Sequence, residues 1–359
     1  MANGTHSPSP HCWNGRYTSV KNRVRINHSH CFYDIWYQIS ATSLRDGSAI
    51  DIILDDLDRN KIAQHQIKNF IWIFDLGPEG ISSEDLEKVY QWFLLQGVQK
   101  KNFRVAFSAI EDVAKIDYPC VCLKDRLIYN GNWYQHLKNQ NIRWSELEIS
   151  YKLICLMRRP SMSRALLAKK LLAKFDDKSL LISLGTDGGY CDSFIQKLIH
   201  PRPFPIVIDA PIVDQYVQHK LGHELFYGCA ANFIVETSDY TAENTWHSIF
   251  ITEKTFKALA WHQFPLWYAA PGLVGEVRKL GFDVFDDLFD NHAYDEIQDS
   301  WVRMTQVVLL AQRFCNQGLV QLRQRHWNRL VKNAQRIEEL HTTAISRHTE
   351  ALERLIYGT

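Results

Sequence analysis

A short apolar run, Phe70–Phe74 (FIWIF), is the feature that most restricts what this chain can fold into. A run without polar alternation is typical of a strand that is buried on both faces of a parallel sheet. Similar runs recur at residues 103–107, 151–157 and 231–235, and stretches with helical periodicity separate them. Because alternating strands and helices form βαβ units, we expect an α/β protein with mainly parallel sheets.

Further apolar runs and helical periodicities extend this pattern along the chain. We expect additional strands at residues 31–39, 49–54, 119–123, 180–184, 205–208 and 265–268. We expect helices at residues 83–94, 163–175, 252–261 and 273–280, and helical structure over most of 294–357. The two series of strands, before and after residue 150, indicate two α/β halves.

The length of 359 residues allows about two domains, each with a core of its own. We expect a flexible arm at residues 1–29, a Rossmann-like domain at 30–148, a second Rossmann-like domain at 149–300, and a long helical C-terminal tail at 301–359. The two Rossmann-like domains would face a cleft. Ligands of such sheets bind outside the carboxyl ends of the strands, so functional residues are expected in the turns that follow strands.

The composition excludes several classes of protein. Lysine and arginine number 41, aspartate and glutamate 40, and a net charge of +1 argues against a nucleic-acid coat or a polybasic membrane binder. The eight cysteines contain no CxxC pair, which favours free thiols in a reducing compartment. The polar N-terminus does not resemble a signal peptide, and no apolar run reaches the roughly 18 residues of a membrane span. We therefore expect a cytoplasmic protein, in the host cytoplasm if it is viral.

A basic turn follows the predicted strand at 151–157. Arg158 and Arg159 come directly after the strand, and Arg164 lies in the helix that follows. Guanidinium groups beside a helix N-terminus favour a phosphate or diphosphate. The alternative is a solvated basic turn with no ligand.

An acidic residue ends another predicted strand, and a second helix start follows it. Glu236 closes the strand at 231–235, Thr252 is a suitable N-cap, and Glu253 and Lys254 occupy the first helical turn. An acid and a base at such a place can hold a ribose diol and a diphosphate, respectively, and we count Glu236 and Thr252 with them as expected donor-binding residues. In the alternative reading, Glu253 only complements the helix dipole and Lys254 is only solvated.

Two segments resemble known glycosyltransferases. The segment FITEKTFKALAWHQFPLWYAAPG is similar to the donor-binding region of GT-B-fold enzymes, in particular the fucosyltransferase family and a group of phage-type glycosyltransferases. The earlier segment ICLMRRPSMSRALLAKKLL resembles the corresponding part of the phage-type group, and together the resemblance covers residues 150–300. It implies inverting, metal-independent transfer of a hexose or pentose from a nucleotide-diphospho-sugar, with no other cofactor. By this resemblance Glu253 binds the donor ribose, and Lys254 and one of Arg158 and Arg159 bind the diphosphate.

The turn after the FIWIF run carries two candidate general bases, Asp75 and Glu79. Sugar transfer with inversion needs a carboxylate or histidine that removes the proton of the acceptor hydroxyl. The fucosyltransferase-like proteins use a glutamate in a comparable turn, which makes Glu79 the first choice and Asp75 the second. Alternatively, Asp75 only stabilises the turn and Glu79 is solvated.

No residue pattern predicts a metal site. The pair His219 and His223 has helical ligand spacing, but Gly222 weakens a helix there and no third ligand is apparent. The acidic stretch at 55–58 is read as the cap of a helix beginning near Arg59, and the pair at 286–287 as a second helix start. We expect no metal.

Two alternative functions remain open. One is a DNA-base glycosyltransferase that acts on a hydroxymethyl-pyrimidine and binds DNA through the basic part of the tail. That part contains Arg323, Arg325, Arg329, Lys332 and Arg336. The other is a non-catalytic nucleotide-sugar-binding or assembly protein. The sequence leaves open the sugar, the acceptor (a glycan, a small molecule or a modified DNA base), the stereochemical outcome and the oligomeric state.

Overall fold

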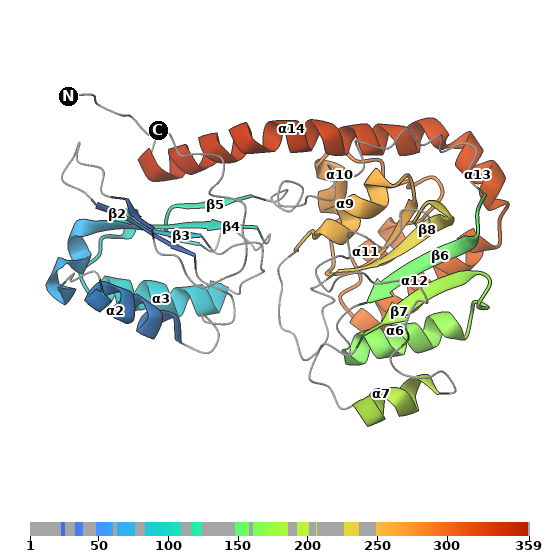
Figure 1. The fold of residues 1–359 in the computed structure, drawn as a ribbon, viewed down its shortest axis with the longest axis horizontal. Helices are drawn as coiled ribbons and strands as arrows, with labels where there is room; N and C mark the ends of the chain where they lie inside the picture. Colours follow the sequence, from blue (N-terminus) through green and yellow to red (C-terminus); the bar gives the residue numbers. More distant parts are fainter. Residues whose placement is uncertain are drawn as a thin grey trace. The chain divides into compact units, whose positions relative to one another are not determined.

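The chain divides into two compact units in the computed structural model (Figure 1). Unit 1 comprises Met1–Asn130, Trp246–Phe250 and His341–Thr359, and unit 2 comprises Gly131–Thr245 and Ile251–Leu340. The structure describes residues 23–25, 33–38, 48–59, 63–75, 83–108, 116–123, 148–157, 161–185, 192–200, 206, 226–236 and 249–357. Each unit is an α/β structure built around its own sheet.

Unit 1 contains a five-stranded sheet in the order β1-β2-β3-β4-β5. The strands are β1 (Arg23–Arg25), β2 (Tyr33–Gln38), β3 (Phe70–Asp75), β4 (Phe103–Phe107) and β5 (Cys120–Cys122). All neighbouring pairs are parallel except β1 with β2. The mainly parallel sheet expected from the apolar runs is therefore confirmed in this unit.

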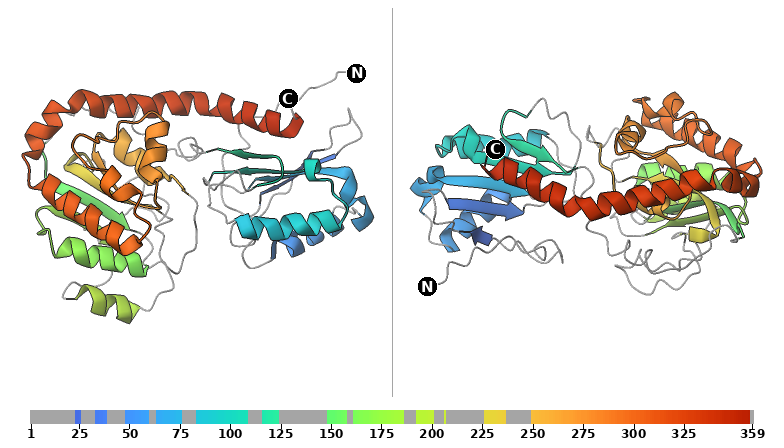
Figure 2. Two further views of the ribbon diagram at one scale, coloured as in Figure 1. Left: turned by 180° about the vertical axis from the view of Figure 1, so that it is seen from behind. Right: turned by 90° about the horizontal axis from the view of Figure 1, so that it is seen from above.

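The central strands of unit 1 are buried on both faces. Trp72 and Phe74 pack with Phe93 and Phe103 in the core beneath α2 (Ser48–Arg59) and α3 (Ser83–Leu95), which lie on one face of the sheet (Figure 2). On the other face, Ala106 packs with Leu355 near the end of the last helix. Short 3₁₀ turns at Gln64–Asn69 and Lys100–Asn102 precede β3 and β4.

The predicted strand at 49–54 is wrong, because these residues form the first half of α2. Its buried residues, Ala49, Ile53 and Leu57, are spaced four apart and therefore share one face of a helix. The apolar run at 50–54 concealed this spacing. Asp55 and Asp58 consequently lie exposed within the helix and do not cap a helix that begins at Arg59.

Unit 2 contains a four-stranded, entirely parallel sheet in the order β7-β6-β8-β9. The strands are β6 (Tyr151–Met157), β7 (Leu180–Leu184), β8 (Cys229–Val235) and β9 (Phe264–Tyr268). Every residue of the central strand β8 is buried, and so is every residue of β9 at the edge of the sheet. In place of the predicted strand at 205–208, the described part of that segment shows an isolated bridge between Ile206 and Leu184.

A helix follows each strand of unit 2, as in βαβ units, and further helices come after the last strand. The helices are α6 (Met162–Leu172), α7 (Asp192–Ile199), α9 (Glu253–Ala260), α10 (Leu273–Lys279), α11 (His292–Asp295), α12 (Ser300–Cys315), α13 (Leu319–Arg325) and α14 (Trp327–Tyr357). Helix α14 begins in unit 2, and its turns from His341 onward belong to unit 1. There the guanidinium of Arg104 donates to the Leu355 carbonyl at 2.6 Å.

The pair Asp286 and Asp287 lies in a turn and does not start a helix, so that prediction is also wrong. Asp286 accepts two hydrogen bonds from Arg278, at 3.0 Å each. Asp287 accepts two from Arg329 of α14, at 2.7 Å each. Asp286 therefore binds this turn to the end of the nearby helix α10, and Asp287 binds it to α14, which is distant in sequence.

Two further observations concern composition. The described cysteines, Cys120, Cys122, Cys155, Cys229 and Cys315, are all free thiols. Among the described helices, none combines the length and apolar character needed to cross a bilayer.

Candidate functional site

The carboxylate of Glu236 is the centre of a polar cluster at the carboxyl end of the unit 2 sheet. Glu236 directly follows β8, and its backbone N–H donates to the Tyr268 carbonyl at 3.1 Å, which extends the pairing with β9. Its side chain is 0% exposed. A carboxylate in such a place needs several donors or a cation to offset the loss of water.

Helix α9 supplies most of these partners. Oε1 of Glu236 accepts from the backbone N–H of Thr252 at 3.1 Å and from the Thr255 hydroxyl at 2.6 Å. Oε2 accepts from the Thr252 hydroxyl and lies 3.8 Å from Nζ of Lys254. Because the carboxylate binds both the N-cap residue Thr252 and Thr255 in the first turn, it fixes where α9 begins. The Glu236 cluster is defined here as Glu236, Thr252, Lys254, Thr255 and Arg164.

Thr252 is the N-cap of α9, as the sequence predicted. It has an extended backbone, and its side-chain oxygen accepts from the N–H of Lys254 at 3.3 Å while donating to Glu236. The Thr255 hydroxyl likewise accepts from the indole N–H of Trp267 at 3.1 Å. Each hydroxyl thus has a donor and an acceptor role, so the network is satisfied within the protein.

Arg164 brings a second helix start to the same place. It lies in the first turn of α6, whose N-cap Ser161 accepts from the N–H of Arg164 at 3.2 Å. Its guanidinium lies 3.4 Å from the Glu236 carbonyl, to which it donates. Since β6 and β8 are adjacent parallel strands, the N-termini of the helices that follow them, α6 and α9, converge.

The charges of this region favour an anion. Arg164 and Lys254 are half-buried cations, and two helix N-termini add partial positive charge. Glu236 is enclosed by its own partners, whereas Glu253 is half-buried in the first turn of α9. The arrangement can therefore hold a phosphate near the cations and a hydroxyl-bearing group near Glu253.

The sequence reasoning missed two residues here. Thr255 was not singled out, although it anchors the Glu236 carboxylate. Lys257 was not singled out either, and it is 5% exposed in the second turn of α9. Burial lowers the pKa of Lys257 to about 8, and Lys254 adds to this effect while Glu253 opposes it. Its position four residues after Glu253, on the same helix face, is the signal that could have identified it.

The other predicted site residues are less fully placed. Arg158, Arg159 and Glu79 lie outside the described residues, as does the pair His219 and His223. Asp75 is the last residue of β3, in register with Gln38 and Ala106. The carboxyl end of that strand is thus confirmed as the location of Asp75.

Where the structure describes the chain, no three histidine, cysteine, aspartate or glutamate side chains are grouped so as to hold a metal ion. The acidic pair Asp286 and Asp287 binds Arg278 and Arg329, respectively.

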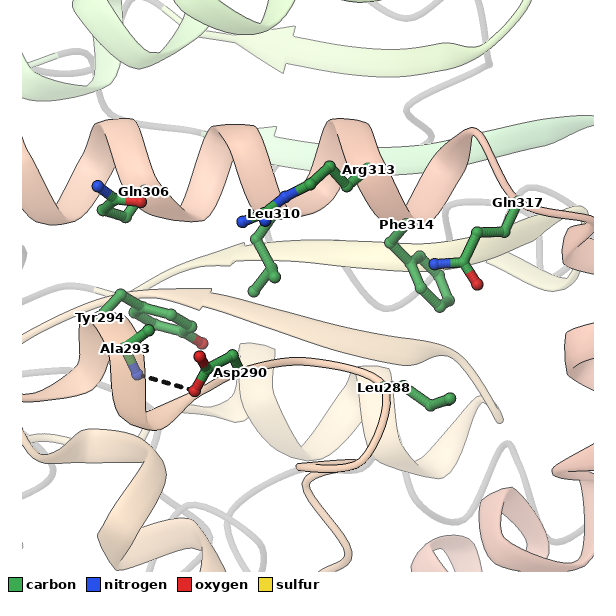
Figure 3. A pocket seen from close by; sticks show the side chains of 9 residues that line it. All are labelled: Leu288, Asp290, Ala293, Tyr294, Gln306, Leu310, Arg313, Phe314 and Gln317. Carbon is green, nitrogen blue, oxygen red and sulfur yellow. Dashed lines mark hydrogen bonds between the residues drawn. The ribbon is translucent and has the colours of Figure 1, made fainter.

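A pocket of about 270 Å³ lies elsewhere in unit 2, between α11 and α12 (Figure 3). Tyr294 and Ala293 line one side, and Gln306, Leu310 and Arg313 line the other. Asp290 at its rim accepts from the N–H of Ala293 at 3.2 Å. None of the residues predicted from the sequence to bind a ligand lines this pocket.

The basic part of the C-terminal tail is largely engaged inside unit 2. Arg323 is buried and donates to the Tyr227 carbonyl at 3.1 Å. Arg329 binds two aspartates, and Arg336 donates to the Leu280 carbonyl and to Glu339, each at 2.9 Å. Arg325 and Lys332 are exposed. Three of the five basic residues are therefore already committed to contacts within the protein.

Comparison of the chain with protein-family models, with curated proteins and with solved structures finds no match.

Proposed function

We propose that this chain is a glycosyltransferase that moves a sugar from a nucleotide-diphospho-sugar to an acceptor hydroxyl. The observation that carries the proposal is the convergence of the α6 and α9 N-termini, with Arg164 and Lys254, at the carboxyl ends of adjacent parallel strands. Such a place favours a diphosphate on electrostatic grounds. The similarity of residues 150–300 to the donor-binding region of GT-B enzymes supports the same assignment.

In this proposal unit 2 binds the donor. Lys254, Arg164 and one of Arg158 and Arg159 bind the diphosphate, and Glu253 binds the ribose diol. Glu236 and Thr252 are positioning residues, because their polar atoms are used to fix the start of α9. As the bond between the sugar and the diphosphate breaks, negative charge grows on the leaving oxygen. The cations and helix N-termini stabilise that charge without a metal.

Unit 1 supplies the acceptor side in a GT-B-like arrangement. Glu79, or failing it Asp75, takes the proton of the acceptor hydroxyl as its oxygen attacks the anomeric carbon, which inverts the configuration there. Closure of the donor site against water would limit hydrolysis of the sugar nucleotide. The free thiols of the described cysteines fit a reducing compartment, and we place the enzyme in the cytoplasm.

A donor panel tests the proposal. The protein is incubated with UDP-, GDP-, ADP-, CDP- and dTDP-sugars, without acceptor and then with glycans, small alcohols or hydroxymethylated DNA, and nucleoside diphosphate release is measured. We expect release from one nucleotide class, stimulated by one acceptor class. Donor binding without release would instead support a non-catalytic nucleotide-sugar-binding protein, and neither binding nor release would overturn the proposal.

The DNA-base alternative is tested in the same assay. The commitment of Arg323, Arg329 and Arg336 to internal contacts leaves fewer cations for a DNA backbone than the sequence implies. A gel shift with hydroxymethylated and plain DNA over a range of salt concentrations measures what remains, because phosphate contacts weaken steeply with salt.

A further inference from the structure

Lys257 is a buried cation that the proposed mechanism does not use. It lies in the second turn of α9, is 5% exposed, and forms no hydrogen bond or ion pair with another described residue. The other buried cations of unit 2 differ in this respect. Arg303 donates to the carbonyls of Ile297 and Gln298, and Arg323 donates to that of Tyr227. A lysine that loses most of its hydration without gaining a partner carries a free-energy cost.

The ammonium of Lys257 lies toward the start of α9. Side chains on a helix point back toward its N-terminus, so residue 257 covers the turn that contains residues 253 and 254. Both Glu253 and Lys254 act electrostatically on Lys257, in keeping with this direction. The fully enclosed polar atoms that lack a hydrogen-bond partner do not include Nζ of Lys257. The tip of the side chain therefore still meets solvent. Lys257 thus has a buried stem and an accessible tip beside the Glu236 cluster.

We infer that Lys257 is a further donor-binding residue, whose ammonium binds a phosphate of the nucleoside diphosphate. The inference rests on the proposed function for the identity of the ligand. Its independent basis is a lysine that is 5% exposed, that forms no hydrogen bond with a described residue, and whose accessible tip is directed at a helix N-terminus that two other cations already flank. An incoming phosphate would supply the hydrogen-bond acceptor that Lys257 does not find among the described residues.

The titration of Lys257 provides a readout that a structural lysine would not give. Burial lowers its pKa to about 8, so near pH 8 a sizeable fraction of the amine is uncharged before ligand binds. The charged groups that act on it are Glu253 and Lys254, both on its own helix. A bound phosphate favours the charged amine, so binding should take up a proton, at most about half a proton per site at pH 8.

The experiment compares the wild type with Lys257→Met, and with Lys174→Met as a control at an exposed lysine of unit 2. Calorimetry at pH 8 in two buffers of different ionisation enthalpy measures the affinity and the proton uptake for inorganic pyrophosphate and for the nucleoside diphosphates. Methionine matches the lysine stem and removes a buried charge, so the variant should fold, which its thermal midpoint checks.

We expect Lys257→Met to bind both probes about tenfold more weakly or worse and to lose the proton uptake, with the control unchanged. Equal affinity and equal proton uptake in Lys257→Met and the wild type would overturn the inference and leave the proposed function standing. A Lys257-dependent anion site in a protein that transfers no sugar would uphold the inference on pyrophosphate and overturn the proposed function. A wild type that binds neither probe would overturn both.

Discussion

The hydroxyl of Thr255 donates to Oε1 of Glu236 at 2.6 Å, and this bond joins the end of β8 to the first turn of α9. The same hydroxyl accepts from the indole of Trp267 on β9. Two neighbouring strands and one helix are thereby held together by a single buried side chain. The placement of Lys254 and Glu253 depends on this junction, because both lie in the turn that it fixes.

Glu236→Gln should destabilise the protein by about 1–3 kcal/mol, the cost of leaving buried donors poorly satisfied. A glutamine has one acceptor oxygen, whereas Glu236 accepts on two from Thr252 and Thr255. Denaturant unfolding measures the change, with Glu296→Gln as a control at an exposed position of the same unit. An unchanged free energy of unfolding would contradict the role of Glu236 as an anchor.

Lys254→Ala should weaken nucleoside diphosphate binding by about 1.5–3 kcal/mol, the range for hydrogen bonds to charged groups. The side chain is 27% exposed and 3.8 Å from Glu236, so stability should change much less than binding. Calorimetric titration compares this variant with Lys169→Ala, which removes an exposed lysine late in α6. Identical affinities in a folded Lys254→Ala protein would remove Lys254 from the donor site.

Glu79→Gln should lower the rate of sugar transfer by about 10²–10⁴ and leave donor affinity nearly unchanged, as expected when only a general base is lost. Asp75→Asn is the comparison, and transfer rates at saturating donor are the measurement. If Asp75→Asn alone is slow, Asp75 is the base. If both variants retain full turnover, neither carboxylate has that role.

His262 should make the protein less stable in mild acid. It follows α9 with φ of 57°, stacks on Trp327 at 5.0 Å, and burial together with Arg323 lowers its pKa to about 4. Because the unfolded chain binds this proton near pH 6.5 and the folded chain does not, stability is complete above about pH 6.5. It falls as the pH drops toward 4, by at most about 3 kcal/mol.

The matched measurement for His262 uses His262→Asn, since asparagine tolerates the left-handed backbone. Unfolding free energies at pH 7, 6, 5 and 4.5 are compared with those of the wild type and of His292→Asn, a variant at an exposed position. The wild type and His292→Asn should lose stability over this range more steeply than His262→Asn. Parallel curves for all three proteins would refute the assignment.

Arg329→Met should cost about 1–2 kcal/mol near neutral pH, a value reduced for the partial exposure of its partners. Arg329 binds both Asp283 and Asp287 and lies over the Phe285 ring at 4.6 Å. Burial alone would raise the pKa of Asp283, but the hydrogen bonds from Arg329 outweigh it, and they lower the pKa of Asp287 as well.

These depressed pKa values give Arg329→Met a pH signature. The stability they contribute is present above about pH 4 and is lost as the carboxylates protonate below it. The difference between the wild type and Arg329→Met should therefore shrink below pH 4. A difference that stays constant across that range would indicate that Arg329 acts by packing rather than by charge.

The sequence by itself determined the strands that have uninterrupted apolar runs, such as Phe70–Phe74, because such a run has few other solutions than a sheet covered on both faces. It also determined the start of α9, since Thr252 caps a helix through bonds to its nearest neighbours in the chain. At residues 49–54, where the apolar run is short and interrupted by an acid, the local pattern predicted a strand. The structure has a helix there, because Ala49, Ile53 and Leu57 lie on one helical face and are buried together.

Only the tertiary structure decided which polar residues form hydrogen bonds or ion pairs within the protein. Arg329 reads as a free cation in the sequence, yet its partners are aspartates 42 and 46 residues away. Glu236 reads as a ligand-binding acid, yet its carboxylate is bound by the N-cap of α9, Thr252, which lies 16 residues later in the chain. Lys257 was not singled out from the sequence, and the packing of α9 buries it. Long-range partners and the burial of charged groups depend on tertiary packing, which the local sequence pattern does not specify. Apolar strand runs and helix caps depend instead on residues that are neighbours in the sequence.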